Sequence, residues 1–130
     1  MNKKRKISST YGEVQKQEVL STRDPRTLIK MLFDKACTLL KMAIRSGDAD
    51  DDEDFQKSSL HALQIVLSLR FVLDTSAKDD LSTGLFETYT AIAASLFRAK
   101  EKKDLEALNK IYLALDELRE AWDILLSKEP

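Results

Sequence analysis

Hydrophobic residues recur along most of the chain at the spacing of amphipathic helices. Between residues 24 and 127 they return every three or four positions, with charged residues between them. This spacing places apolar side chains on one face of an α-helix. Residues 1–23 are mostly polar, with only scattered apolar positions. The pattern therefore predicts a mobile N-terminal arm over residues 1–23 and a helical domain over residues 24–130.

Short polar segments divide this domain into four predicted helices. Asp24 supplies an N-cap acceptor before Pro25, which suits the first helical position. Gly47 is predicted to end this first helix, and the acidic run 48–54 to form a solvated loop. The later helices are predicted over about 54–74, 80–99 and 104–127. Helices of about 20 residues with short connections indicate an all-α fold, an antiparallel up-down four-helix bundle.

The second predicted helix is apolar on two sides. Its first stripe suits a bundle core and consists of Ala62, Val66, Leu69 and Leu73, widened by Ile65 and Val72. A second stripe on nearly the opposite side consists of Leu60, Leu63, Leu67 and Phe71. The fourth helix, by contrast, has one core stripe, formed by Leu108, Ile111, Leu115, Leu118, Trp122 and Leu126. A bundle helix buries one face, so the second stripe needs another segment to cover it.

The third predicted helix has a line of small side chains beside its core face. This line consists of Gly84, Thr88, Ala91 and Ser95. Small residues at this spacing let another helix approach closely, so the two stripes together predict a groove for a guest helix. The residues leave two other covers open, the N-terminal arm and a second copy of the chain. A monomer and a weak homodimer therefore both remain open.

Charge and cysteine usage narrow the classes of partner. The 130 residues include 21 Lys and Arg and 22 Asp and Glu, giving a formal net charge of -1, so no nucleic-acid partner is expected. A single cysteine, Cys37, excludes an internal disulfide and fits a reducing cytosol. No apolar run approaches the ~20 residues that span a bilayer, and none follows the basic residues 1–6. We therefore expect a cytoplasmic protein without membrane insertion or a secretory signal.

Candidate chemistry is sparse, and we expect no enzyme activity, metal or cofactor. The strongest alternative is a histidine phosphotransfer domain, also a four-helix bundle, because His61 lies between the two stripes of its helix. One turn further on, however, Gln64 and Ile65 stand where that chemistry needs a basic and a small side chain. One histidine also excludes a di-iron bundle. Cys37 fits a small buried hydrophobic residue.

Four segments of the chain read, in order, PRTLIKMLFDKACTLLKMA, HALQIVLSLRFVLD, LFETYTAIAASLFRA and LNKIYLALDELREAW. They resemble the signatures of the flagellar secretion chaperone family FliS, and the likeness extends over about residues 19–126. Phe33 and Phe86 stand where the family usually has tyrosine, and Lys100 replaces a frequent asparagine.

The resemblance implies a function without catalysis. It implies that the bundle binds the disordered C-terminal segment of flagellin, prevents premature polymerisation and delivers it to the flagellar type III export apparatus. Contacts with the export-gate protein and with flagellar regulators are implied as further partners. Tyr11 in the arm is placed among the partner-binding residues. Two roles for the arm stay open, as a plug of the empty groove or a clamp on the guest.

Overall fold

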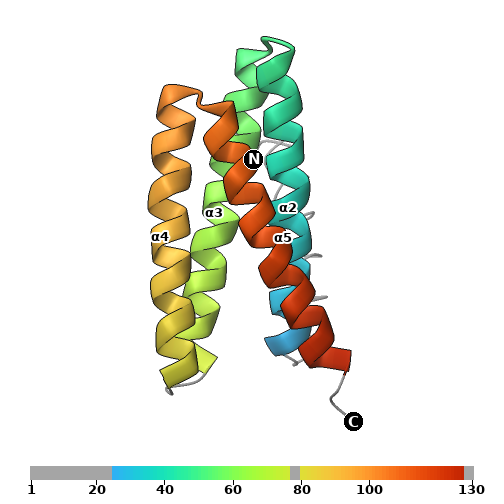
Figure 1. The fold of residues 1–130 in the computed structure, drawn as a ribbon, viewed down its shortest axis with the longest axis vertical. Coiled ribbons are helices and arrows are strands. Elements are labelled where there is room, and N and C mark those ends of the chain that lie inside the picture. Colours follow the sequence, from blue (N-terminus) through green and yellow to red (C-terminus); the bar gives the residue numbers. More distant parts are fainter. Residues whose placement is uncertain (1–24, 77–79, 128–130) are drawn as a thin grey trace, which may run out of the picture.

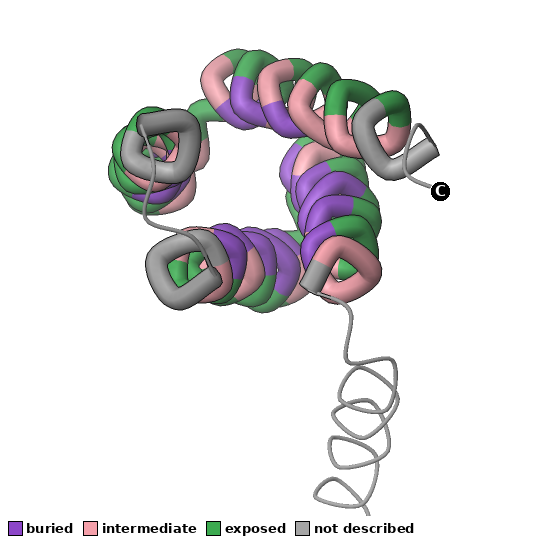
Figure 2. Tube along the Cα trace, turned by 90° about the horizontal axis from the view of Figure 1, so that it is seen from below, coloured by how far each residue is buried: buried purple, intermediate pink, exposed green. Residues whose placement is uncertain are grey.

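The computed structural model describes residues 25–76 and 80–127, which form four long helices (Figure 1). These are α2 (Pro25–Asp48), α3 (Asp52–Ser76), α4 (Asp80–Lys102) and α5 (Leu105–Ser127). Each helix packs against the next, and α5 packs against α2, so the helices form a ring with their buried faces turned inward (Figure 2). The predicted all-α, up-down four-helix bundle is confirmed. The predicted arm lies outside the described residues.

The core is built from the stripes that the sequence indicated. Its largest fully buried side chains include Tyr89, Phe33, Phe55, Leu40, Leu69, Leu96, Leu108 and Leu115. The rings of Phe33 on α2 and Tyr89 on α4 meet edge to face, with centroids 5.8 Å apart. Burial of these side chains supplies the main favourable free energy of folding. The core is therefore shared by all four helices.

The end of α2 differs from the sequence prediction at Gly47. The helix runs on to Asp48, and the left-handed backbone conformation falls at Asp50, with φ of 56°. Gly47 is buried instead, and a Cβ atom there would lie 2.5 Å from a methyl carbon of Leu105. The predicted glycine cap is wrong, because the left-handed residue after the helix is Asp50 and not Gly47. Gly47 instead lets α2 pass close to the start of α5.

The acidic run is shorter as a loop than predicted, because Asp52, Glu53 and Asp54 form the first turn of α3. Carboxylates there stabilise the positive end of the helix dipole. Lys103, in the loop between α4 and α5, places its Nζ 2.6 Å from Asp52 and 3.4 Å from Asp50. The hydrogen bond to Asp52 is the main cause that raises the pKa of Lys103. This lysine thus joins the two loops at one end of the bundle.

Candidate partner-binding surface

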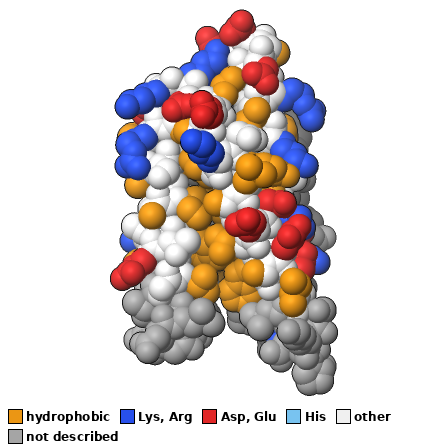
Figure 3. Space-filling model, in the orientation of Figure 1, with side chains coloured by type: hydrophobic (Ala, Val, Ile, Leu, Met, Phe, Trp, Pro, Cys, Tyr) orange, Lys and Arg blue, Asp and Glu red, His pale blue; other side chains and the backbone are white. Residues whose placement is uncertain are grey.

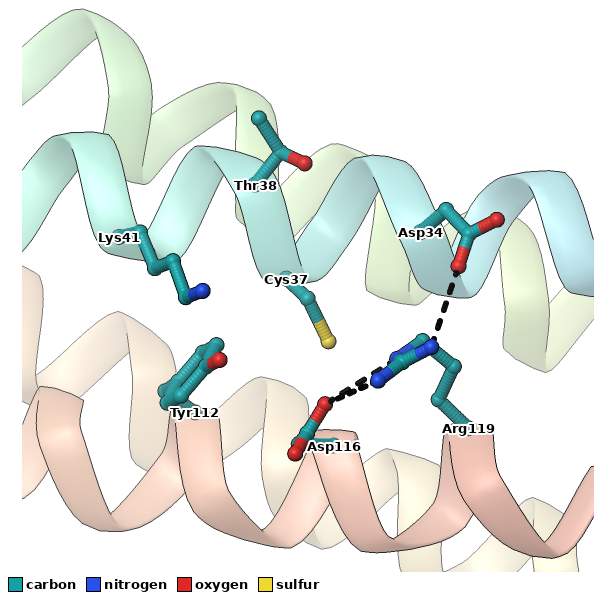
Figure 4. Close-up of a pocket in the computed structure, with 7 residues that line it drawn as sticks. All are labelled: Asp34, Cys37, Thr38, Lys41, Tyr112, Asp116 and Arg119. Atoms are coloured by element: carbon teal, nitrogen blue, oxygen red, sulfur yellow. Dashed lines mark hydrogen bonds and ion pairs between the residues drawn. The ribbon is translucent and has the colours of Figure 1, made fainter.

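A charged network holds α5 against α2 (Figure 4). Arg119 donates from Nε and Nη2 to Asp116 at 3.1 and 2.7 Å. Its Nη1 lies 3.8 Å from Asp34 on α2 and 3.6 Å from Asp123. Lys30 of α2 lies 3.3 Å from Asp123 on α5, which adds a second ion pair between these helices. The network fixes α5 to one neighbour, α2.

Beside this network lies a cavity of about 240 Å³ with the Cys37 thiol at its wall. It is lined by Asp34, Cys37, Thr38, Lys41, Tyr112, Asp116 and Arg119. Burial, and after it the negative charge of Asp116, raises the pKa of Cys37 to about 11. The thiol is therefore neutral at physiological pH, whereas nucleophilic cysteines need a lowered pKa. This agrees with a structural role for Cys37.

Stability should fall when the pH rises above about 9, because two buried groups hold their protons in the fold. Burial raises the pKa of Cys37 from 9.0 to about 11 and that of Tyr89 from 10.0 to about 12. Between the ordinary and the raised pKa of each group, the unfolded chain binds fewer protons than the native chain. The free energy of unfolding therefore decreases as the pH rises through these two ranges. We expect the free energy of unfolding, measured by urea denaturation, to fall between about pH 8 and pH 10. The fall should be about 1 kcal/mol larger for the wild type than for Cys37→Ala. Equal losses in the two proteins would contradict this assignment.

On its other side, α5 diverges from α4. The two helices meet near Lys103 and separate toward the opposite end, and their contact is the least extensive between neighbours in the ring (Figure 1). Trp122 Nε1 donates to the Tyr89 hydroxyl at 3.2 Å and thereby joins α5 to α4. Hydrophobic side chains line the hollow between the two helices (Figure 3). We call this hollow the α4–α5 cleft.

Large hydrophobic side chains also lie exposed along α3 and α4. Leu60, Leu67 and Phe71 on α3 and Phe97 on α4 are 46%, 41%, 68% and 52% exposed. Leu63 is half-buried and packs against the core. Because α3 and α4 run antiparallel, the contact of Arg70 with Phe86 places Leu60 near the level of Phe97. We call these residues, together with Arg70 and Phe86, the α3–α4 strip.

One end of the α3–α4 strip contains a pocket. It has a volume of about 240 Å³ and is lined by Leu67, Arg70, Phe71 and Phe86. The Arg70 guanidinium carbon lies 4.7 Å from the centroid of the Phe86 ring. This contact is within the range of a cation–π interaction. Three apolar side chains and one cation therefore line the pocket.

The small side chains of α4 lie on a different side of that helix from the strip. At about 100° per residue, Gly84, Thr88, Ala91 and Ser95 are about 140–200° around α4 from Phe86. The first three are exposed and Ser95 is half-buried. A Cβ atom on Gly84 would meet nothing within 4 Å. The structure therefore does not bring the two predicted stripes into one groove; the small residues lie on a side of α4 turned away from α3.

Sequence reasoning missed Phe86, Phe97 and Arg70 as members of this surface. The spacing of Phe86 and Phe97 could have indicated it, because residues about three helical turns apart lie on one side of α4. His61 is exposed on α3, where its side chain lies outside the strip pocket. Tyr11 lies outside the described residues. Among the helices of residues 25–76 and 80–127, none is long and apolar enough to cross a membrane.

Comparison with known proteins places these features in a family. The model of the FliS family, described as flagellar protein FliS, matches residues 7–129. The flagellar secretion chaperone FliS of Escherichia coli is 23% identical over 118 residues, with 90% of this chain and 87% of the relative covered. That of Salmonella typhimurium is 24% identical over 115 residues, covering 86% and 84%. That of Vibrio cholerae is 27% identical over 117 residues, covering 87% and 83%. The chain therefore belongs to the FliS family of flagellar proteins.

Proposed function

We propose that this chain is a cytoplasmic export chaperone without enzyme activity. It binds the C-terminal segment of flagellin, prevents premature polymerisation and delivers the segment to the flagellar type III export apparatus. The observation that carries this proposal is the α3–α4 strip, a line of large apolar side chains left exposed on a folded bundle. A contiguous exposed apolar surface is typical of a protein-binding site. The related proteins named as flagellar secretion chaperones support the same role.

The proposed guest is disordered before binding and becomes helical on the chaperone. Covering Leu67 and Phe71 removes apolar surface from water, which favours binding. Ordering the guest consumes part of that free energy, so the affinity stays moderate for the area covered. A moderate affinity suits a chaperone that must release its guest at the export gate. In this proposal the export gate and flagellar regulators are further partners.

The proposed guest contacts two surfaces, which lie on different sides of α4. One is the α3–α4 strip, with Leu60, Leu63, Leu67 and Phe71, and the other is the side with Gly84, Thr88, Ala91 and Ser95. Since these sides point away from each other, a guest that reaches both has to pass around α4. Small side chains on the second side let its backbone approach closely. Tyr11 of the arm is included among the proposed contacts.

Isothermal titration calorimetry tests the proposal with a peptide of the flagellin C-terminal segment. We expect binding at about one to one, with a negative heat-capacity change because apolar surface is buried. The N-terminal segment of the same flagellin serves as control and should bind far more weakly. Equal binding of the two segments, or a heat-capacity change near zero, would refute the proposal.

A further inference from the structure

Arg70 is a cation within an otherwise apolar surface. It lies between Leu67 and Phe71 in the sequence, is half-buried, and contacts the ring of Phe86. Its Nε atom is buried and has no hydrogen-bond partner. Among the side chains that the structure describes, none provides a carboxylate for Arg70. The α3–α4 strip therefore contains one positive charge whose only described partner is an aromatic ring.

Covering the strip changes the energetic situation of this cation. In the free protein, water solvates the part of Arg70 that remains accessible. A guest that covers the strip removes that water, and a buried cation without a partner is strongly unfavourable. The contact with the Phe86 ring satisfies none of the N–H donors of Arg70, and these donors suit the two oxygens of a carboxylate. A guest with an acidic side chain at this point compensates the loss of water.

We propose that the pocket beside Arg70 selects a helical partner segment in which an acidic residue lies about one helical turn from an apolar residue. The apolar side chain enters the pocket between Leu67, Phe71 and Phe86. A glutamate or aspartate about one helical turn away pairs with Arg70. Residues three or four positions apart share a helix face, so one guest helix presents both groups together. This inference rests on the proposed function, since it describes the guest of the same surface.

The position of Arg70 also gives the guest a direction. Arg70 and Phe86 lie toward one end of the strip, and Leu60 and Phe97 toward the other. A purely apolar strip would accept an amphipathic helix in either orientation. A charge pair at one end favours one orientation and register, because the reversed helix leaves Arg70 covered and unpaired. Arg70 is thus a specificity-determining residue.

The test compares two synthetic amphipathic helical peptides and the flagellin C-terminal segment. The peptides share one pattern of leucines and differ only in a Glu or a Lys one turn from the central leucine. We expect the wild type to bind the Glu peptide about tenfold more tightly than the Lys peptide, and Arg70→Glu to reverse this preference. Arg70→Gln should weaken binding of the flagellin segment about tenfold. The control is Arg45→Gln, an exposed arginine of α2 outside the proposed contacts, which should leave each affinity within about twofold.

The outcomes separate this inference from the proposed function. If flagellin fails to bind while the wild type prefers the Glu peptide, the proposed function is wrong and the role of Arg70 stands. If flagellin binds the wild type and Arg70→Gln equally and the two peptides do not differ, the chaperone function stands and the role of Arg70 is wrong. Circular dichroism of each variant shows whether the helices remain folded.

Discussion

Leu67→Asp is expected to weaken binding of the flagellin C-terminal segment about a hundredfold while the bundle stays folded. Leu67 is 41% exposed, so an aspartate there stays in contact with water in the free protein. In the complex the new carboxylate replaces a wall of the strip pocket. It also lies three residues before Arg70 and is able to pair with it, which removes the guest's acidic residue from its proposed partner. Calorimetry with the flagellin segment measures the loss.

Ser68→Asp provides the matched control for this substitution. Ser68 is exposed on α3, directly after Leu67, but about 100° around the helix from it. The control adds the same charge to the same helix outside the strip, so its affinity should stay near that of the wild type. A fall in thermal stability for Leu67→Asp as large as that for a core truncation would show instead that Leu67 belongs to the core.

The second large effect is expected for the core of α5. Leu115 is fully buried, and Leu115→Ala leaves a cavity between α5 and its neighbours. We expect a loss of about 2–5 kcal/mol in the free energy of unfolding, from lost transfer free energy and the cavity together. Small domains are stable by only about 5–15 kcal/mol, so this is a large fraction. Urea denaturation followed by circular dichroism gives the value.

Leu113→Ala tests whether position, and not leucine itself, determines this loss. Leu113 lies on the same helix and is 52% exposed. Its truncation should change the free energy of unfolding by no more than about 0.5 kcal/mol. Similar losses at the two positions would mean that the outer face of α5 is covered, which would argue for a stable homodimer through that face.

The helices and the core were predictable because each helix carries its own periodic pattern. Leu69 and Leu115, for example, belong to stripes that can be recognised within single helices. How one helix turns toward its neighbour is not contained in such a pattern. Burial of Leu69 and Tyr89 in the shared core sets that rotation, and it leaves Leu67 and Thr88 on different sides of the pair of helices. The sequence pattern therefore indicates both stripes but not that they lie on different sides of α4, and the two remain proposed contacts.

The divergence of α5 from α4 likewise could not be predicted from the spacing of hydrophobic residues. It depends on contacts such as the ion pair of Arg119 with Asp34, which join residues far apart in the chain. A charged position within a helix usually indicates a solvated face, and nothing in its local spacing identifies a partner on another helix. The α4–α5 cleft follows from this packing and had no sequence signal of its own.

The unequal packing of α5 gives the bundle a gradient of local stability along its length. At one end Lys103 joins two loops, and Gly47 lets α2 and α5 pack closely. Toward the other end α5 leaves α4, and Trp122 is the described residue that donates a hydrogen bond between them. Segments with fewer packed contacts open at lower free-energy cost than the core. We therefore expect the contact of α5 with α4 to open at lower free-energy cost at the Trp122 end than at the Lys103 end, while the ion pairs of Arg119 and Lys30 keep α5 on α2.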